Sequence, residues 1–296
     1  MALAHSFYAE QAAVLGHLDE ARRRRQFVLD FYGESPADPF AISARVYSQA
    51  KMAILDGDLD AAERYYRVAT EGFGRLDRPV MNSVCLAMVA DFDERAGDYA
   101  AAITTLEAAI ATNESLLGGF TGSLQARLGW VLLHDRQVAR AEVAYQRSLD
   151  AARRVRHLMV LFAAQAGMAV LHRLGGRDDD AVEAADEALE LYRAHGFRQF
   201  RNRIDPKTDL QTAAAVCYEV LAAITAERDE PEQTATLLGR AEHLRVVSGV
   251  AVPGFLHDDV GEARRAATAA LGDEGFTAAF EWGRHEEAVS QPAEAL

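Results

Sequence analysis

The residues that could carry out chemistry are scattered along this sequence, and none of the common catalytic motifs is complete. His285-Glu286-Glu287 lacks the second histidine one turn later that would place two imidazoles on one zinc ion. No phosphate-binding motif of the G-x-x-x-x-G-K-[ST] or G-x-G-x-x-G type occurs. We therefore expect no catalytic residues, no metal and no cofactor, and an enzyme whose triad assembles from distant residues is the less favoured alternative.

Three other segments carry reactive or charged residues, and each has a simpler structural interpretation. The glycine-rich segment 118–122 has no preceding strand that would present it to a phosphate, so we interpret it as a loop. The basic run 22–25 points in four directions around a helix, which favours a solvated surface over an anion-binding stripe. Cys85 and Cys217 lie in apolar helical stretches, where we expect buried thiols.

The composition is that of a folded protein with an acidic surface. Half of the 296 residues are hydrophobic and 26% are charged, with 31 Lys and Arg against 45 Asp and Glu, a net charge of −14. This charge repels nucleic acid phosphates and anionic lipid headgroups, so we expect no direct contact with nucleic acid or membrane. The longest apolar stretch, 158–171, is too short to span a bilayer, and the acidic N-terminal segment is unlike an export signal. These features, with only two cysteines, predict a cytoplasmic protein.

The strongest pattern in the sequence is a short turn followed by an alanine-rich segment, which recurs along the chain. The turns begin at Gly16, Gly57, Gly97, Arg136, Gly176 and Asp229. Their intervals are 41, 40, 39, 40 and 53 residues, so the period is 40 with one insertion. The insertion includes 196–207, a basic segment with a proline that predicts an exposed loop or a displaced helix end.

Each copy of the pattern is expected to be a helical hairpin. Glycine can end the first helix in the left-handed conformation, aspartate can cap the second, and alanine lets the two helices approach closely. Apolar residues at three- and four-residue spacing, such as Ile103, Leu106 and Ile110, give each helix a face to bury. Stacked hairpins bury these faces whereas a single hairpin cannot, so we predict an all-α, right-handed superhelix of about six hairpins.

This pattern resembles the tetratricopeptide repeat family over residues 1–248. The residues that best preserve the family pattern are Leu128-Gly129, Leu132, Val138, Ala141 and Tyr145. The period of 40 exceeds the family's usual ~34, which predicts longer helices. We therefore assign residues 1–248 to the repeat domain and 249–296 to a helical cap and tail, with 291–296 as a frayed end or an extension of the cap.

The C-terminal segment carries a second, more specific resemblance. A helix containing Leu237-Leu238-Gly239 is followed by a break at 249–253, a helix ending in Ala-Leu-Gly at 270–272, and a short helix at 276–279. This order resembles the carboxyl terminus of large actinobacterial regulators of the LuxR and antibiotic-regulatory types. The resemblance implies a role in transcription regulation and signal sensing.

A concave groove is the expected binding surface, because the first helix of each hairpin lines it. The residues predicted to face this groove lie just before each hairpin turn or about two helical turns before it. They are Tyr47, Lys51, Asp91, Glu94, Arg95, Trp130, His134, Arg173 and Glu219. Aromatic rings and guanidinium groups are effective anchors for a peptide or a small ligand, and Trp130 is the foremost candidate. The alternative is that these residues only fill or solvate the superhelix.

These observations predict a non-catalytic binding module. The leading hypothesis is the sensor or interaction region of a bacterial transcriptional regulator, which binds a protein or peptide partner or a small effector in the groove. The alternative is a stand-alone adaptor that binds a protein or forms a homodimer through the apolar end of its first hairpin.

Overall fold

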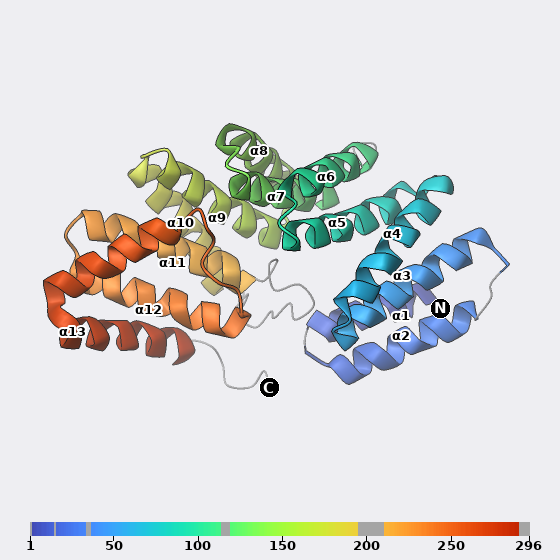
Figure 1. Cartoon of the computed structure of the whole chain (residues 1–296), viewed down its shortest axis with the longest axis horizontal. Coiled ribbons are helices and arrows are strands. Elements are labelled where there is room, and N and C mark those ends of the chain that lie inside the picture. The colour runs from blue at the N-terminus through green and yellow to red at the C-terminus, as the bar shows by residue number, and fades with distance from the viewer. Residues whose placement is uncertain (1, 15, 34–36, 114–118, 195–209, 290–296) are drawn as a thin grey trace. The chain divides into compact units, whose positions relative to one another are not determined.

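The computed structural model describes residues 2–14, 16–33, 37–113, 119–194 and 210–289, which form thirteen helices and no strand (Figure 1). The chain divides into two compact units, Met1–Asp135 and Arg136–Leu296. The N-terminal unit contains α1 (Ala2–Val14), α2 (Leu18–Tyr32), α3 (Pro39–Asp56), α4 (Leu59–Arg75), α5 (Pro79–Arg95), α6 (Tyr99–Asn113) and α7 (Gly119–His134). The C-terminal unit contains α8 (Val138–Val155), α9 (Leu158–Leu174), α10 (Asp178–Ala194), α11 (Leu210–Glu227), α12 (Pro231–Ser248) and α13 (His257–Val289).

All six turns predicted from the sequence are present, and each begins at a residue with positive φ. These residues are Gly16 (81°), Gly57 (79°), Gly97 (80°), Arg136 (58°), Gly176 (67°) and Asp229 (59°). The predicted aspartate cap is found in two copies, where Asp58 accepts a hydrogen bond from the Ala61 amide at 2.9 Å and Asp98 accepts one from the Ala101 amide at 3.0 Å. The second helices α2, α8 and α12 begin without a side-chain cap hydrogen bond. The left-handed residue is therefore the feature that all six turns share.

The residue five positions after each turn start explains how closely the helices pack. In the first five copies it is an alanine with no exposed surface: Ala21, Ala62, Ala102, Ala141 and Ala181. In the sixth copy it is Thr234, which is equally buried and whose hydroxyl lies 2.9 Å from that of Thr225. The degenerate copy thus keeps the small buried residue and satisfies its extra polar atom with a neighbouring hydroxyl.

Within each unit, every helix packs against the next one along the chain, both inside hairpins and between them. The first helices of neighbouring hairpins also meet. In the N-terminal unit Arg127 of α7 donates a hydrogen bond to the Ala87 carbonyl of α5 at 3.1 Å, and in the C-terminal unit α9 contacts α11. Helices of 17 and 18 residues, such as α4 and α3, confirm the longer helices that the period of 40 predicts.

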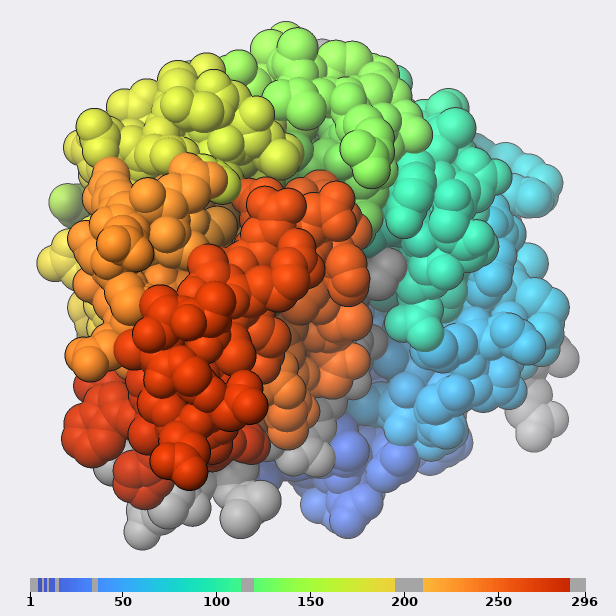
Figure 2. Space-filling view, turned by 60° about the vertical axis from the view of Figure 1, so that its left-hand side comes forward, coloured from blue at the N-terminus to red at the C-terminus, as the bar shows by residue number. Residues whose placement is uncertain are grey.

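The segment after the sixth hairpin folds onto it. The predicted break follows Gly249, and the backbone of Gly272 (φ 67°, ψ 170°) kinks α13 into two helical parts. The second part extends to Val289 and is longer than the short helix predicted at 276–279. It lies closely on α12, because a Cβ on Gly239 would approach the Phe280 carbonyl oxygen to 2.0 Å. Figure 2 shows the orange and red atoms of this C-terminal segment as one continuous surface.

One sequence-based expectation is wrong at this level. The glycine-rich stretch interpreted as a loop belongs to a helix from Gly119 onward, because α7 begins there. Four small residues in the first turns do not prevent a helix whose later face, including Leu124 and Leu128, is buried. Residue 118, the inserted segment 196–207 and the tail at 291–296 lie outside the described residues.

Candidate binding site

The predicted groove residues of α3 lie next to an aromatic cluster. The Tyr47 ring meets the rings of Tyr66 and Phe73 of α4 edge-on, with centroids 5.9 and 6.5 Å away. The Lys51 ammonium lies 5.8 Å from the centroid of the Tyr47 ring. Tyr47 is half-buried, so this ring helps to hold α3 on α4 as well as contributing to the surface.

Two of the three predicted residues of α5 are buried acids. Asp91 and Glu94 are 9% and 8% exposed, whereas Arg95 is exposed in the last turn. Asp91 forms an ion pair with Arg127 of α7. Because Arg127 also bonds to the backbone of α5, the Asp91 carboxylate contributes to the contact between two neighbouring first helices.

The foremost candidate, Trp130, lies in a small aromatic group. Its ring meets that of His134, one turn later in α7, edge-on with centroids 5.2 Å apart. The ring of Tyr99, the first residue of α6, stacks on the His134 ring, with the two ring centroids 5.4 Å apart. Trp130 and His134 are half-buried, so they combine packing with a partly accessible surface. The structure therefore brings these two predicted residues together with an aromatic ring, Tyr99, that the sequence analysis did not select.

In the C-terminal unit, Arg173 of α9 joins three other helices. Its guanidinium donates to Asp178 of α10 at 3.1 Å, to Asp259 of α13 at 2.9 Å and to Glu227 of α11. These hydrogen bonds raise the pKa of Arg173 above its ordinary value, and the bond to Glu227 has the largest effect. With 13% of its side chain exposed, Arg173 serves chiefly as a structural connection.

The last predicted residue, Glu219 of α11, forms a buried ion pair. The Arg245 guanidinium of α12 donates to its two oxygens from Nε at 2.8 Å and from Nη2 at 2.7 Å. The two side chains are 1% and 6% exposed. Burial raises the pKa of Glu219 above 4.5, against the opposing effect of Arg245, and the nearby Glu242 carboxylate adds to the rise.

This ion pair forms part of the wall of a recess of about 260 Å³ between α11, α12 and the start of α13. Apolar residues and charged residues share the lining. It consists of Glu219, Leu238, Ala241, Glu242, Arg245, Val252, His257, Val260, Gly261 and Arg264. Arg264 extends along the second part of α13, since its guanidinium carbon lies 4.8 Å from the centroid of the Phe280 ring.

Arg245 has hydrogen-bonding capacity that the described residues leave unused. Nε and Nη2 bond to Glu219, whereas Nη1 is buried and has no acceptor among the described residues. Buried donors in folded proteins almost always have partners, so this nitrogen is an exception; it has no accessible surface and does not itself open into the recess. We name the ten lining residues the α11–α13 recess.

Sequence analysis identified one residue of the α11–α13 recess, Glu219, and missed the others. A signal for part of it was present, because Leu238, Ala241, Glu242 and Arg245 follow the three- and four-residue spacing of one helix face. The α13 residues His257, Val260, Gly261 and Arg264 follow the same spacing. The sequence does not show that the two faces meet, because this depends on how the chain returns after Gly249.

Two kinds of group among the described residues bear on chemistry by a metal or a thiol, namely metal-ligating side chains and the two cysteines. No group of three or more His, Cys, Asp or Glu side chains among them is arranged to hold a metal ion. Burial raises the pKa of Cys85 to about 12 and also raises that of Cys217, and both thiols are buried. No described helix has the length and apolar character needed to cross a membrane.

Comparisons with known proteins identify the fold. No family model matches the sequence, and no curated protein matches it. Among solved structures, BtubC (BKLC) from P. vanneervenii is similar with a TM-score of 0.55 and 16% identity, covering 83% of this chain and 94% of BtubC. A Rap protein complexed with Competence and Sporulation Factor is similar with a TM-score of 0.52 and 12% identity, covering 100% of this chain and 84% of Rap.

These likenesses and the recurrent hairpins define the class of the molecule. The chain is an all-α helical-repeat protein of the solenoid type. At these identities the similarity concerns the fold, and the α11–α13 recess is described from this chain's own residues.

Proposed function

We propose that this protein is a non-catalytic binding module whose ligand enters the α11–α13 recess. The observation that carries the proposal is the recess itself, about 260 Å³ in volume, in which the apolar side chains of Leu238, Val252 and Val260 lie beside charged groups. Recesses lined by apolar side chains and a few polar groups are the usual form of a small-ligand site. That a Rap protein of similar fold was solved in complex with Competence and Sporulation Factor supports ligand binding by such a fold.

The biological setting we propose is regulation in the bacterial cytoplasm. The resemblance of the C-terminal segment to actinobacterial transcriptional regulators supports a sensor or interaction region, in which a small effector or a protein or peptide partner biases an attached switch. The surface around Trp130 and His134 is the proposed contact for a protein or peptide partner, because aromatic residues are favoured anchors in such contacts.

A ligand screen with a blocked recess tests this function. Gly261→Met places a longer side chain in the recess, and a Cβ at this helical position meets only the tip of Arg265, at 3.4 Å. We expect small effectors that stabilise the wild type in a thermal-shift assay, by binding the folded state, to lose this effect in Gly261→Met. Glu262→Met, on the exposed surface next to it, is the control. A screen of metabolites and short peptides in which no compound separates Gly261→Met from the control would overturn the proposal.

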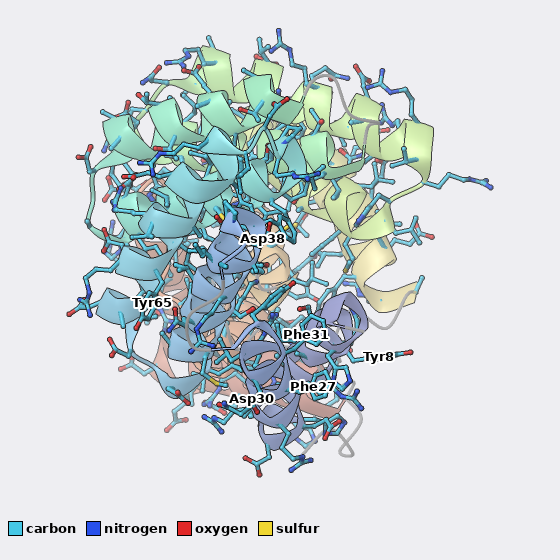
Figure 3. All side chains as sticks on the ribbon, turned by 90° about the vertical axis from the view of Figure 1, so that its right-hand side faces the viewer. Tyr8, Phe27, Asp30, Phe31, Asp38 and Tyr65 are labelled. Atoms are coloured by element: carbon cyan, nitrogen blue, oxygen red, sulfur yellow. The ribbon has the colours of Figure 1, made fainter. Side chains whose placement is uncertain are left out.

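A second candidate function, homodimerisation as an adaptor, is favoured by the surface of the first hairpin. Tyr8 of α1 and Phe31 of α2 are 54% and 57% exposed, and Tyr8 points away from the helices (Figure 3). The Arg24 guanidinium lies 5.1 Å from the centroid of the Tyr8 ring, so a polar group covers part of this surface. Sedimentation of the wild type and of the double variant Tyr8→Ser/Phe31→Ser tests this candidate function. We expect the wild type to sediment as a dimer and the double variant as a monomer. A monomeric wild type, or a double variant that is still a dimer, would contradict it.

A further inference from the structure

The connection between α8 and α9 carries a basic and apolar surface on a chain whose net charge is −14. This surface, which we name the α8–α9 patch, consists of Arg147, Arg154, Val155, Arg156, Leu158 and Met159. We propose that the α8–α9 patch binds a short acidic segment of a partner protein, which supplies carboxylates to the arginines and bulky apolar side chains to the apolar residues. The patch shares no residue with the α11–α13 recess, so the two sites can be tested separately.

The arginines of the α8–α9 patch have no partner among the described residues. Arg147, Arg154 and Arg156 are exposed, and none of their guanidinium groups bonds to a described side chain or carbonyl. Arg173 and Arg177 of the same unit, in contrast, donate to carboxylates. A guanidinium presents its N–H groups in a plane that matches a carboxylate, and such charge-assisted bonds are stronger than neutral ones. A carboxylate is therefore the partner that these three groups favour.

Two of these arginines form a stripe along α8. Arg147 and Arg154 are seven residues apart, which places them on one face of the helix, two turns from each other. The exposed Val143 lies one turn before Arg147 on the same face. Asp150, the acidic residue between the two arginines in sequence, accepts a hydrogen bond from Gln146 at 3.3 Å. From Val143 to Arg154 the stripe is about 16 Å long, which matches about three helical turns of a bound segment.

The apolar residues of the patch lie where the chain passes from α8 to α9. Val155, Leu158 and Met159 are 47%, 37% and 38% exposed, and they fall within five positions of one another. Single exposed apolar residues are ordinary, whereas a group of them bordered by charged residues is typical of a contact surface. Methionine is flexible and adapts to the shape of a partner. Bulky apolar side chains of the bound segment would remove this group from water.

Local structural roles do not account for the patch. Arginines in the last turn of a helix stabilise it through the helix dipole, which applies to Arg153 and Arg154. Arg147 lies two turns earlier, beyond the range of this effect. Arg156 has φ 54°, a conformation that glycine adopts at lower cost, so the turn itself does not require a long side chain. Neither role requires an exposed Leu158.

The small size of the patch favours a protein segment over an extended polyanion. Glu142 lies near the opposite end of α8, where Arg177 donates to it at 3.2 Å, and the exposed Asp179 and Asp180 follow in the first turn of α10. A nucleic acid or an anionic bilayer would extend over these carboxylates as well as over the patch. A segment of three turns stays beside the arginines, and charges more than about 8 Å away are largely screened at physiological salt. A phosphate backbone also has no counterpart for the apolar residues.

Fluorescence anisotropy with defined peptides tests the proposal on the full chain. The probes are fluorescein-labelled peptides of about twelve residues, rich in glutamate, with leucine or phenylalanine at three positions in every helical and extended spacing. We expect at least one probe to bind, more weakly as salt is added. Replacing its glutamates with glutamine, or its apolar residues with serine, should weaken binding roughly tenfold or more. The absence of binding by every probe at about 1 mM would overturn the proposal.

Matched variants connect peptide binding to the arginines. Arg147→Gln/Arg154→Gln should weaken binding roughly tenfold or more, because two charge-assisted bonds are lost. Arg228→Gln/Arg265→Gln is the control, since it removes two exposed arginines of the same unit outside the patch and changes the net charge equally. Equal binding by the two double variants would show that the probes respond only to overall charge and would overturn the assignment to the patch.

Arg156→Gly separates binding from folding. Glycine adopts φ 54° readily, so we expect this variant to keep or raise the thermal midpoint of the wild type while its affinity for the peptide falls several-fold. Unchanged affinity in Arg156→Gly together with unchanged affinity in Met159→Gln would exclude the connection between α8 and α9 as part of the contact. Gly261→Met should bind the peptide as the wild type does, which keeps failure of the recess distinct from failure of the patch.

Three further measurements test the class of partner. A labelled DNA duplex and phosphatidylserine vesicles should bind more weakly than the best peptide, and tighter binding of either would overturn the proposal in favour of that polyanion. Sedimentation detects a second copy of this chain as the occupant. A wild-type dimer that Arg147→Gln/Arg154→Gln dissociates would assign the α8–α9 patch to self-association and overturn binding of a separate partner.

Discussion

The Glu219 carboxylate of α11 and the Arg245 guanidinium of α12 share two hydrogen bonds of 2.8 and 2.7 Å in the interior of the C-terminal unit. Removing two charges from water has a large cost, which the attraction between them roughly offsets. The pair therefore adds little net stability, but breaking it leaves an uncompensated buried charge. It also fixes the plane of the guanidinium that borders the α11–α13 recess.

Loss of one partner of this pair should destabilise the protein far more than loss of both. We expect Glu219→Gln to lower the free energy of unfolding by about 3 to 5 kcal/mol, because the Arg245 charge stays buried. The double variant Glu219→Leu/Arg245→Met should lie much closer to the wild type. Urea denaturation measures both, and a double variant as unstable as Glu219→Gln would contradict this account of the pair.

The contact between Gly167 of α9 and Tyr145 of α8 leaves no room for a side chain. A Cβ on Gly167 would lie 2.2 Å from the Tyr145 ring, and Tyr145 is only 2% exposed. Gly167→Ala should therefore destabilise by about 1 to 3 kcal/mol through overpacking. Gly74→Ala is the control, because a Cβ there meets only Asn82 at 3.8 Å and alanine favours the helix. Equal thermal midpoints for the two variants would contradict this prediction, because they would show that the Tyr145 ring moves aside without a loss of stability.

Arg173 should be a stronger contributor to stability than its neighbour Arg177. Arg173 bonds to three carboxylates on three helices and is 13% exposed, whereas Arg177 is 44% exposed and pairs with Glu142 at 3.2 Å. We expect Arg173→Ala to cost about 2 kcal/mol and Arg177→Ala less than about 1 kcal/mol. Chemical denaturation of the two variants in parallel measures the two losses of stability. A larger loss for Arg177→Ala than for Arg173→Ala would contradict this prediction.

The Arg173–Glu227 bond predicts a stabilising contribution that is lost in acid. The hydrogen bond from Arg173 lowers the pKa of Glu227 below 4.5 in the folded protein. The folded state then binds fewer protons than the unfolded state in this range, so the contribution is present above pH 4.5 and disappears as the pH falls through the folded pKa. Because Glu227 is exposed, the effect is at most about 1 kcal/mol. The stability difference between wild type and Glu227→Gln should shrink from pH 7 to pH 3. A constant difference would contradict the linkage.

Both cysteines should be unreactive in the folded protein. Cys85 and Cys217 are buried without exposed surface, and burial raises the pKa of each thiol well above its usual range. The thiolate, which is the reactive form, is therefore scarce at pH 8. A thiol reagent such as DTNB should modify neither cysteine under native conditions and both in denaturant. Rapid reaction of either thiol in the native protein would show that its helix opens locally.

The positions of the hairpins could be predicted because their causes are local. A left-handed residue, a capping aspartate and a small residue five positions later act within one or two turns of the chain, and their period is visible in the sequence. The degenerate copy has no side-chain cap but keeps the small residue, since Thr234 occupies the buried position of the alanines. The glycine-rich start of α7 was misjudged because its glycines oppose a helix locally, while later residues of the same helix gain from burial.

The sequence by itself thus determined an all-α chain of repeated hairpins, with a turn at each of six named positions. The tertiary structure alone decided which distant side chains meet. Arg173 reaches Asp259 across 86 residues, and Arg245 reaches Glu219 across 26. No local period encodes these contacts, because they depend on the packing of α11, α12 and α13. The α11–α13 recess is a consequence of that packing, and so is the single nitrogen of Arg245 that its ion pair leaves unused.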